Sequence, residues 1–442
     1  MSYLNQHFFT TTIYHMRTLF FTLFLLFSFG AFAQTYTVVA DSLRLPNGIE
    51  FDAQGRLWVT ESGYGFNDGA VSIVQPDGAL LPVVTELPAF YDTTSQENVG
   101  PWHTVVLNGN ELGVLSPING GILIFNLAGF TPGVSQPLTA ASATTVPIAD
   151  FVFQNQPPGM GDSNPYTAVR DANGNWYVAD AGFNGIVRVA ASDGQRSVFC
   201  KFDPIANPTP VGPPFIDAVP TRIIAKPGGG FYVCNLTGFP FLEGSASIFE
   251  VSDNGTVSTL HTGLNMLTDL ALDASTGDLF ALQFGAFDFS IFNIAPNSGK
   301  VWRIHPDGTK EAVIENISYA PGMALDGQGN VYVSELASGR ILRFDGAASG
   351  IAEKSTEVTS LRLSPNPAIE VVNIDFTLPD ASPVRISVLD AAGKTVYSRS
   401  LGLMETGAHQ FTLPLSEYSK GCYWVDIQTA NGVKTSQLVV VK

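Results

Sequence analysis

A strand–turn–strand pattern, repeated along most of the chain, constrains the fold more than any other feature of the sequence. Six copies can be aligned, 47 to 64 residues apart, and the three clearest are 45–61, 165–180 and 321–335. The copies begin at Pro46, Pro101, Pro165, Pro220, Leu267 and Pro321. A repeat of this length is typical of solenoids, propellers and arrays, in which each repeat is one supersecondary unit.

Each copy predicts four antiparallel strands. The first strand alternates apolar and polar residues, as in 48–51, and a glycine-containing turn such as 52–55 follows it. The second strand, for example 176–178, is rich in β-branched and aromatic residues. A third strand runs in four copies into an Asp-Gly or Asn-Gly turn, and a fourth strand such as 257–264 ends the unit. Four antiparallel strands per repeat are typical of a β-propeller blade.

The sixth copy stops after its third strand. Residues 36–43 near the N-terminus have the pattern of the fourth strand at 257–264. A strand from the N-terminus that completes the last blade would close the ring and remove its open edges. We therefore predict an all-β fold in which residues 35–345 form a six-bladed β-propeller closed by this strand. Two insertions, 130–161 and 203–217, are predicted to be long surface loops.

The N-terminus predicts export. Met16-Arg17, the apolar run 19–29 and the small residues of 31–33 follow the order of a secretory signal peptide. The apolar run is too short to span a bilayer, and we expect cleavage before Gln34. Residues 1–33 are thus a predicted signal peptide, in which either Met1 or Met16 is the true start.

Charge and motifs exclude several classes of function. The net charge of −17 makes nucleic acids and anionic membranes poor partners, because like charges repel. The cysteines Cys200, Cys234 and Cys422 have no paired spacing, so we expect buried thiols and no disulfide. The sequence holds no nucleophile elbow, zinc-protease motif, phosphate loop or Cys-x-x-Cys motif. Without a complete catalytic motif the sequence favours a protein that is not an enzyme, although it leaves the question open.

The chain changes character after the last repeat. Residues 346–359 are polar and aperiodic and predict a linker, and 360–442 predict a small β-sandwich. The motif Ser364-Pro365-Asn366-Pro367, the hairpin 388–394 and the strand 420–425 resemble the type IX secretion system C-terminal sorting domain, type A. The ending, 434–442, is similar to that family as well.

This resemblance implies that the type IX secretion machinery is a partner of the chain. It implies passage across the outer membrane, after which the protein is either released or anchored at the cell surface. Cys422 departs from the family, which usually has valine or isoleucine at this position. A sorting domain is an address and leaves the activity of the propeller open.

The propeller part resembles the ScyD/ScyE family in three segments, 162–166, 177–182 and 235–244. The loop Thr237-Gly238-Phe239-Pro240-Phe241 is the most specific of these matches. More broadly, the repeats are similar to NHL and SMP-30/gluconolactonase-like six-bladed propellers. Membership of the ScyD/ScyE family implies no established reaction, and a shared fold does not assign chemistry.

Polar residues are predicted to gather on one face of the propeller, where first strands begin and second strands end. Five of the six second strands end in a carboxylate or an amide, and the other ends in Ser116. The predicted ligand-binding residues on this channel face are Asn47, Glu61, His103, Asp180, Arg222, Asn235, Gln283 and Glu335. A ring of oxygen ligands could also hold a hard cation such as Ca²⁺, for which the candidates are Asn47, Asp269, Glu61 and Glu335.

Three interpretations of this ring stay open. The residue types favour side chains that bond the loops after the strands, and the others are a bound cation and a catalytic metal that activates water. Asn47 and Asp269 match the ligand types of SMP-30-like enzymes, whereas His103 and Arg222 do not. The segment 171–175 mimics the first half of a calcium loop but lacks its glutamate at the twelfth position, so we interpret it as a blade hairpin.

The sequence therefore predicts an extracellular or cell-surface ligand-binding module that is a monomer. Its ligand would be a small molecule, a carbohydrate or a peptide, since aromatic residues in 62–66 and 239–242 are predicted on the channel face. The alternative is a metal-dependent lactonase or related hydrolase. The expected cofactor is accordingly either none or a divalent cation.

Overall fold

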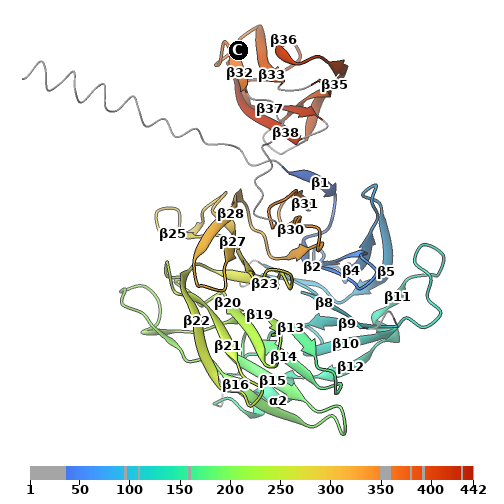
Figure 1. Cartoon of the computed structure of the whole chain (residues 1–442), viewed down its shortest axis with the longest axis vertical. Coiled ribbons are helices and arrows are strands. Elements are labelled where there is room, and N and C mark those ends of the chain that lie inside the picture. The colour runs from blue at the N-terminus through green and yellow to red at the C-terminus, as the bar shows by residue number, and fades with distance from the viewer. Residues whose placement is uncertain are drawn as a thin grey trace, which may run out of the picture. The chain divides into compact units, whose positions relative to one another are not determined.

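The computed structural model describes residues 36–93, 97–107, 110–157, 161–348, 360–378, 381–390, 394–429 and 432–441. These residues form an all-β structure, as predicted (Figure 1). The predicted signal peptide and most of the predicted linker lie outside them.

Residues 37–344 contain six sheets of four or five described strands. Their numbers follow the order of the six sequence repeats. Sheet one holds β2 (Pro46–Phe51), β3 (Leu57–Glu61), β4 (Gly69–Val74), β5 (Leu80–Leu87) and, parallel to β5, β11 (Leu138–Thr139). Sheet two holds β8 (Thr104–Leu107), β9 (Glu111–Ser116), β10 (Gly121–Asn126) and β12 (Thr144–Pro147). Sheet three holds β13 (Pro165–Arg170), β14 (Trp176–Asp180), β15 (Gly185–Val189) and β16 (Arg196–Lys201).

The remaining three sheets repeat this order. Sheet four holds β19 (Pro220–Ala225), β20 (Phe231–Asn235), β21 (Ala246–Val251) and β22 (Val257–Leu264). Sheet five holds β23 (Leu267–Leu272), β24 (Leu279–Gln283), β27 (Gly299–Ile304) and β28 (Lys310–Ile317). Sheet six holds β29 (Met323–Leu325), β30 (Val331–Glu335), β31 (Arg340–Phe344) and β1 (Thr37–Ala40), which pairs antiparallel with β31.

The first strand of each repeat is called its inner strand, and the six inner strands contact one another in a cycle. The contacts run from β2 to β8, β13, β19, β23 and β29, and from β29 back to β2. A side-chain hydrogen bond links each neighbouring pair of sheets near the start of these strands. The six bonds are Ser62 Oγ to Pro101 O, Trp102 Nε1 to Asn164 Oδ1, Thr167 Oγ1 to Thr221 O, Thr221 Oγ1 to Leu267 O, Thr268 Oγ1 to Ala320 O and Ser334 Oγ to Asn47 O.

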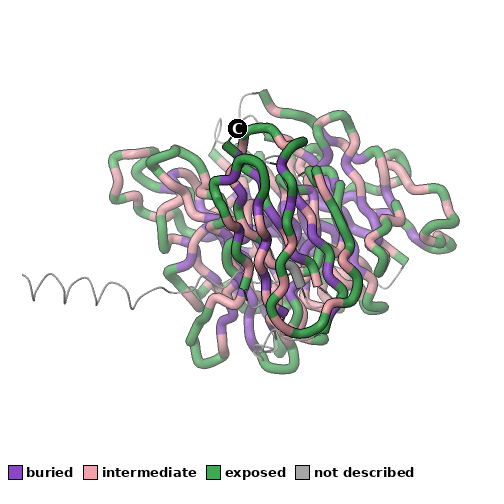
Figure 2. Tube along the Cα trace, turned by 90° about the horizontal axis from the view of Figure 1, so that it is seen from above, coloured by how far each residue is buried: buried purple, intermediate pink, exposed green. Residues whose placement is uncertain are grey.

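Buried apolar residues on facing strands fill the space between neighbouring sheets. Trp58 and Phe125, for example, belong to one cluster between sheets one and two. Figure 2 shows buried residues along the strands and exposed residues mainly at the turns. The alternation read from the sequence therefore places one set of side chains in these interfaces.

The prediction of a long surface loop at 130–161 is wrong. This stretch contains β11, the 3₁₀ turn Ala140–Ser142, the helix α2 (Ala149–Gln154) and β12, the outer strand of sheet two. Three of the four residues of β12 are exposed, so the strand lacks the alternation that marks the others. The second insertion, 203–217, forms a small ribbon of β17 (Ile205–Ala206) and β18 (Phe215–Ile216). Two further ribbons pair β6 (Phe90–Asp92) with β7 (Glu97–Val99) and β25 (Phe287–Asp288) with β26 (Asn293–Ile294).

An aspartate shapes several of the first hairpins. Asp171 accepts hydrogen bonds from the backbone N–H groups of Asn173 at 2.9 Å and Asn175 at 2.8 Å, and from Nδ2 of Asn175. Asp326 makes the same three kinds of contact in sheet six. The segment 171–175 is thus the turn between β13 and β14, as interpreted from the sequence.

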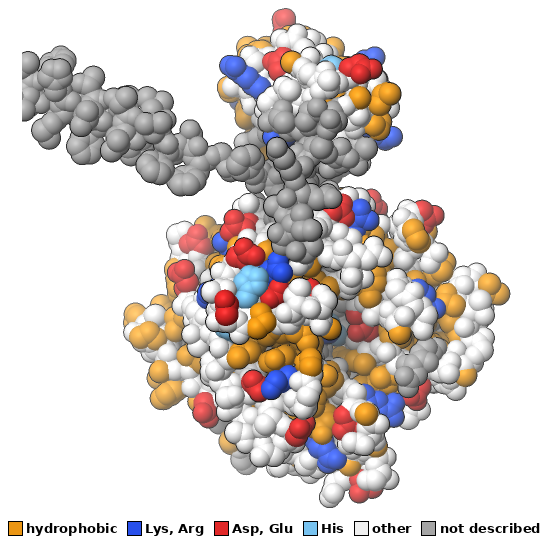
Figure 3. All heavy atoms as spheres, in the orientation of Figure 1, with side chains coloured by type: hydrophobic (Ala, Val, Ile, Leu, Met, Phe, Trp, Pro, Cys, Tyr) orange, Lys and Arg blue, Asp and Glu red, His pale blue; other side chains and the backbone are white. Residues whose placement is uncertain are grey.

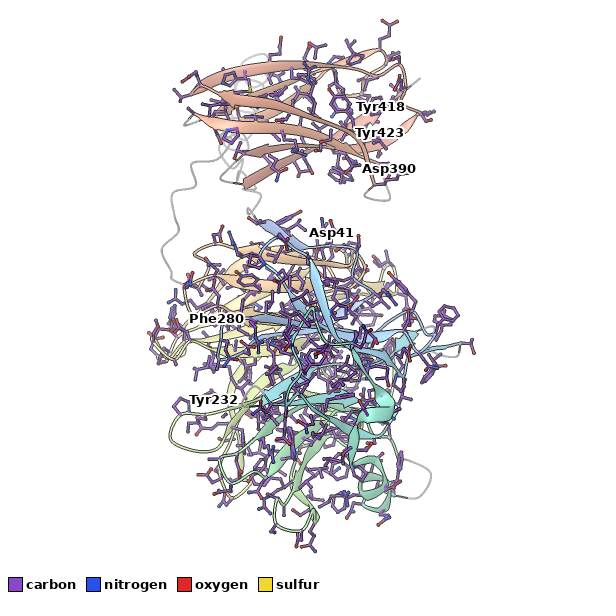
Figure 4. All side chains as sticks on the ribbon, turned by 90° about the vertical axis from the view of Figure 1, so that its right-hand side faces the viewer. Asp41, Tyr232, Phe280, Asp390, Tyr418 and Tyr423 are labelled. Carbon is purple, nitrogen blue, oxygen red and sulfur yellow. The ribbon has the colours of Figure 1, made fainter. Side chains whose placement is uncertain are left out.

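The C-terminal residues form two facing sheets. One holds β32 (Ser360–Ser364), β33 (Val371–Leu378) and β36 (Gly407–Pro414). The other, in spatial order, holds β35 (Thr395–Met404), β34 (Ser382–Leu389), β37 (Gly421–Thr429) and β38 (Gly432–Val440). Buried residues of both sheets, Tyr423 among them, share one core. Tyr418 packs against this core, and its ring meets that of Tyr423 edge to face with the centroids 5.3 Å apart (Figure 4).

Candidate functional site

The predicted strand-end residues all lie at the ends of second strands and are all buried. They are Glu61, Ser116, Asp180, Asn235, Gln283 and Glu335, the last residues of β3, β9, β14, β20, β24 and β30. Asp180 shows what such a residue does: its carboxylate accepts hydrogen bonds from the backbone N–H of Phe183 at 2.9 Å and of Asn164 at 2.8 Å. It also accepts one from the hydroxyl of Ser163 at 2.6 Å.

The other strand ends bind nearby loops in the same way. Asn235 donates to the carbonyl of Ala218 and accepts from the N–H of Ser247, and Gln283 donates to the carbonyl of Ser298. Glu61 accepts from the N–H of Arg44 at 2.6 Å, and Glu335 accepts from Arg340 at 2.7 Å. These side chains therefore hold segments next to the ends of their strands, in keeping with the first of the three interpretations.

Three of the strand-start residues come together in the centre of the ring. Nε of Arg222, on β19, lies 3.1 Å from Oδ1 of Asp269 on β23. Nη1 of the same guanidinium lies 3.4 Å from Nδ1 of His103, which precedes β8. A guanidinium can only donate, so Nδ1 of His103 is the acceptor and its proton is on Nε2. That Nε2 is buried and has no hydrogen-bond partner among the described residues.

Two residues that the sequence analysis missed belong to the same cluster. Oε1 of Glu50, on β2, accepts hydrogen bonds from Oγ1 of Thr104 at 3.2 Å and from the N–H of Val106 at 2.9 Å. The ring of Tyr166, on β13, lies 5.2 Å from that of His103. The sequence does single out Glu50, because it is the one charged residue at a position that is apolar in the other five repeats. Those repeats carry Val105, Val169, Ile224, Ala271 and Leu325 there. We call Glu50, His103, Tyr166, Arg222 and Asp269 the central cluster.

Burial and the Arg222 charge set the protonation states of the central cluster. Burial raises the pKa of the Glu50 carboxyl to about 7, although the positive charge of Arg222 acts in the opposite direction. Burial also raises the pKa of Asp269, against the effects of Arg222 and of hydrogen bonds from the N–H groups of Met323 and Leu270. Burial and Arg222 together hold the pKa of His103 well below its usual range, so its imidazole is neutral.

Each of the predicted metal ligands has a protein partner. Asp269 is buried against the guanidinium of Arg222, which would repel a cation placed at its carboxylate. Asn47 donates through Nδ2 to Oγ of Ser62, and Glu61 and Glu335 bind Arg44 and Arg340. Within the described part of the chain, no group of three or more His, Cys, Asp or Glu side chains is arranged to hold a metal ion.

Aromatic residues do lie on the loops where they were predicted. Tyr64 and Phe66 are exposed on the loop between β3 and β4. In the loop after β20, the ring of Phe239 packs edge to face against Phe241 and Phe287, with centroids 6.1 and 5.9 Å apart. Figure 3 shows hydrophobic side chains at the surface of the part formed by residues 36–348, among acidic and basic side chains.

The comparison with protein families decides how the chain is delivered. Residues 362–442 match the model of the secretion system C-terminal sorting domain. The chain carries a type IX sorting domain. Its destination is therefore the exterior of the cell or the cell surface, and the secretion machinery engages it in transit. No helix of the described residues has the length and apolar character needed to cross a membrane.

Solved structures with similar folds are β-propeller proteins. The gluconolactonase of Xanthomonas campestris is 12% identical over 70% of this chain and 90% of its own, with a TM-score of 0.45. Virginiamycin B lyase of Staphylococcus aureus is 14% identical over 78% of this chain and 96% of its own, with a TM-score of 0.42. PorZ, a surface component of the type IX secretion system of Porphyromonas gingivalis, is 16% identical over 92% of this chain and 61% of its own, with a TM-score of 0.39. No curated protein matches the chain. These similarities concern the fold and assign no activity.

Proposed function

We propose that residues 35–345 are a six-bladed β-propeller of the ScyD/ScyE type, closed by the N-terminal strand. The cycle of inner-strand contacts and the pairing of β1 with β31 support this proposal. Closure in this way stabilises the ring, because backbone hydrogen bonds within sheet six then hold the N-terminal segment that leads into sheet one. The chain would reach the periplasm through the signal peptide at 1–33 and leave it through its sorting domain.

The propeller's proposed role is to bind a small polar ligand at the central cluster. The observation that carries this proposal is that polar or charged side chains from three sheets meet at Arg222, which lies 3.1 Å from Asp269 and 3.4 Å from His103, and that the Arg222 charge also acts on Glu50. The side chain of Arg222 is 17% exposed, and the buried Nε2–H of His103 has no hydrogen-bond partner among the described residues. A buried donor without a partner costs about 1–3 kcal/mol, a cost that a bound ligand with an acceptor atom would remove.

The alternative function, a metal-dependent lactonase, finds little support in the donor set. The carboxylate best placed for a cation, Asp269, already faces Arg222. Metal analysis of the purified full-length chain tests the difference. We expect no stoichiometric divalent ion and no change in Tm on addition of a chelator, whereas a bound ion lost together with stability would favour the hydrolase.

Ligand binding itself is tested by thermal shift of the full-length chain against a panel of mono- and disaccharides, short peptides and small carboxylic acids. At about pH 8, where most of the Glu50 carboxyl is ionised, compounds that raise Tm should lose their effect in Glu50→Gln, which removes this charge while keeping the shape of the side chain. Glu243→Gln, in an exposed loop, is the matched control and should respond like the wild type. Equal shifts in all three proteins would place the binding site outside the central cluster.

A further inference from the structure

The two outer strands of the larger sheet in the sorting domain have different surroundings. At one end, the Ser-Pro-Asn-Pro segment covers β38. Asn366 donates through Nδ2 to the carbonyl of Gln437 at 2.7 Å and accepts from the N–H of Val439 at 2.9 Å. Ala368 continues this contact, since its N–H donates to the carbonyl of Val439 and its carbonyl accepts from the N–H of Val441. The motif by which the family is recognised thus closes this edge.

At the other end, β35 is the last strand of the sheet. Among the described residues, β34 is the one strand that pairs with it. β35 is ten residues long and none of them is buried, although Tyr397, Leu401 and Met404 pack partly against the core. Val396 and Leu403 are 46% and 72% exposed. The strand is therefore held in its domain by pairing with β34 and by these three side chains, and its remaining side chains face solvent.

Such an edge is a template for another strand. Within the described part of the chain, no second strand pairs with its outward N–H and C=O groups. Soluble proteins usually block long exposed edges with charged residues, proline, β-bulges or a covering segment. β35 contains neither lysine nor proline, and its charged residue is Arg399. Irregularities of the β-bulge type interrupt its register with β34 near Val396 and Leu401 and protect the ends of the strand, so the regular run available to a partner strand is 397–400.

We propose that the free edge of β35 is where the type IX machinery holds the sorting domain, by adding a strand of its own to this sheet. The match of 362–442 to the sorting family requires a partner in transit, and β-strand addition uses the groups that β35 presents. The added strand supplies backbone hydrogen bonds along 397–400 and apolar side chains that cover Val396 and Leu403. This proposal rests on the sorting domain and is independent of any ligand in the central cluster.

Export of the full-length chain from a host with type IX secretion tests the proposal. Lysines on an edge strand oppose strand addition, so the double variant Val396→Lys, Leu403→Lys should be retained in the periplasm with at least a tenfold loss of export. Val371→Lys is the matched control, because Val371 is 42% exposed but lies on β33, the middle strand of the other sheet. Equal export of the variant and the control would overturn the proposal. Unchanged urea midpoints of the purified chains establish that both variants are folded.

A photoreactive phenylalanine analogue in place of Val396 or Val371 gives a second readout that needs no change in export. At 396 we expect a cross-link to an outer-membrane component of the type IX machinery, identified by mass spectrometry, and at 371 none. A product at the mass of two copies of this chain would assign the β35 edge to self-association. That product, or equal cross-linking at both positions, would overturn the proposal.

Discussion

The titration of Glu50 gives the sharpest test of the central cluster. Its pKa in the folded protein is about 7, raised from an ordinary value of 4.5 mainly by burial. A carboxyl whose folded pKa is raised favours the folded state in its protonated form. Its contribution to the free energy of unfolding is therefore complete below about pH 4.5 and is lost as the pH rises through about 7.

The size of this effect follows from the two pKa values. A carboxyl pKa that moves from 4.5 to about 7 corresponds to roughly 3 kcal/mol. Glu50 is only partly excluded from solvent, so we expect about 1–3 kcal/mol to be observed. The wild type should thus lose this much stability, relative to Glu50→Gln, between pH 5 and pH 8.

Urea unfolding at several pH values measures this difference. Tryptophan fluorescence follows the propeller well, because four of the five tryptophans, Trp58, Trp102, Trp176 and Trp302, lie within residues 35–345. Subtracting the Glu50→Gln curve removes the titration of groups common to both proteins, and Glu243→Gln serves as an exposed control. A difference that does not vary with pH, or that grows as the pH rises, would refute the argument that burial raises the pKa of Glu50.

Three further substitutions test contacts within the propeller and within the sorting domain. Arg222→Met should destabilise the propeller by about 3–5 kcal/mol in urea unfolding because Asp269 is left buried and unpaired, and adding Asp269→Asn should recover part of this; additive losses would contradict the pairing. Thr221→Val should cost about 1 kcal/mol through loss of the hydrogen bond from Oγ1 to Leu267, and an unchanged midpoint would show that this link between sheets four and five contributes nothing. Asn366→Ala should lower the stability of the sorting domain by about 1–2 kcal/mol and speed hydrogen exchange at Val439, whereas unaltered exchange would indicate that Asn366 does not hold β38.

The repeated strands could be predicted because their signals are local. Alternating side chains and glycine or aspartate turns specify a hairpin within about fifteen residues, as at 165–180, and the structure has β13 and β14 there. The outer strand β12 carries no such signal, because most of its residues face solvent. Its partner β10 also lies about twenty residues earlier in the sequence, too far for a hairpin pattern to show the pairing. It was therefore interpreted as a loop.

The residues of the candidate site show the same division. Position in the repeat was enough to predict that Asp180, Asn235 and Gln283 end second strands, because each copy repeats one local pattern. Position could not tell whether those side chains point at a ligand or at their own loops. Their hydrogen bonds to backbone groups up to seventeen residues away depend on the conformation of each loop, which differs from copy to copy.

The sequence by itself determined that this chain is built from repeated hairpins and ends in a sorting domain, because both are written in local patterns of residues. Only the tertiary structure decided that Arg222 pairs with Asp269 and lies beside His103, 119 residues away in the chain. Only it showed that the charge of Arg222 also acts on Glu50. Contacts of this kind form between inner strands of different sheets, whose distance in space is fixed by the packing of the whole ring and by no stretch of sequence alone. The open edge of β35 has the same origin, because a strand becomes an edge through the order of its neighbours in the sheet.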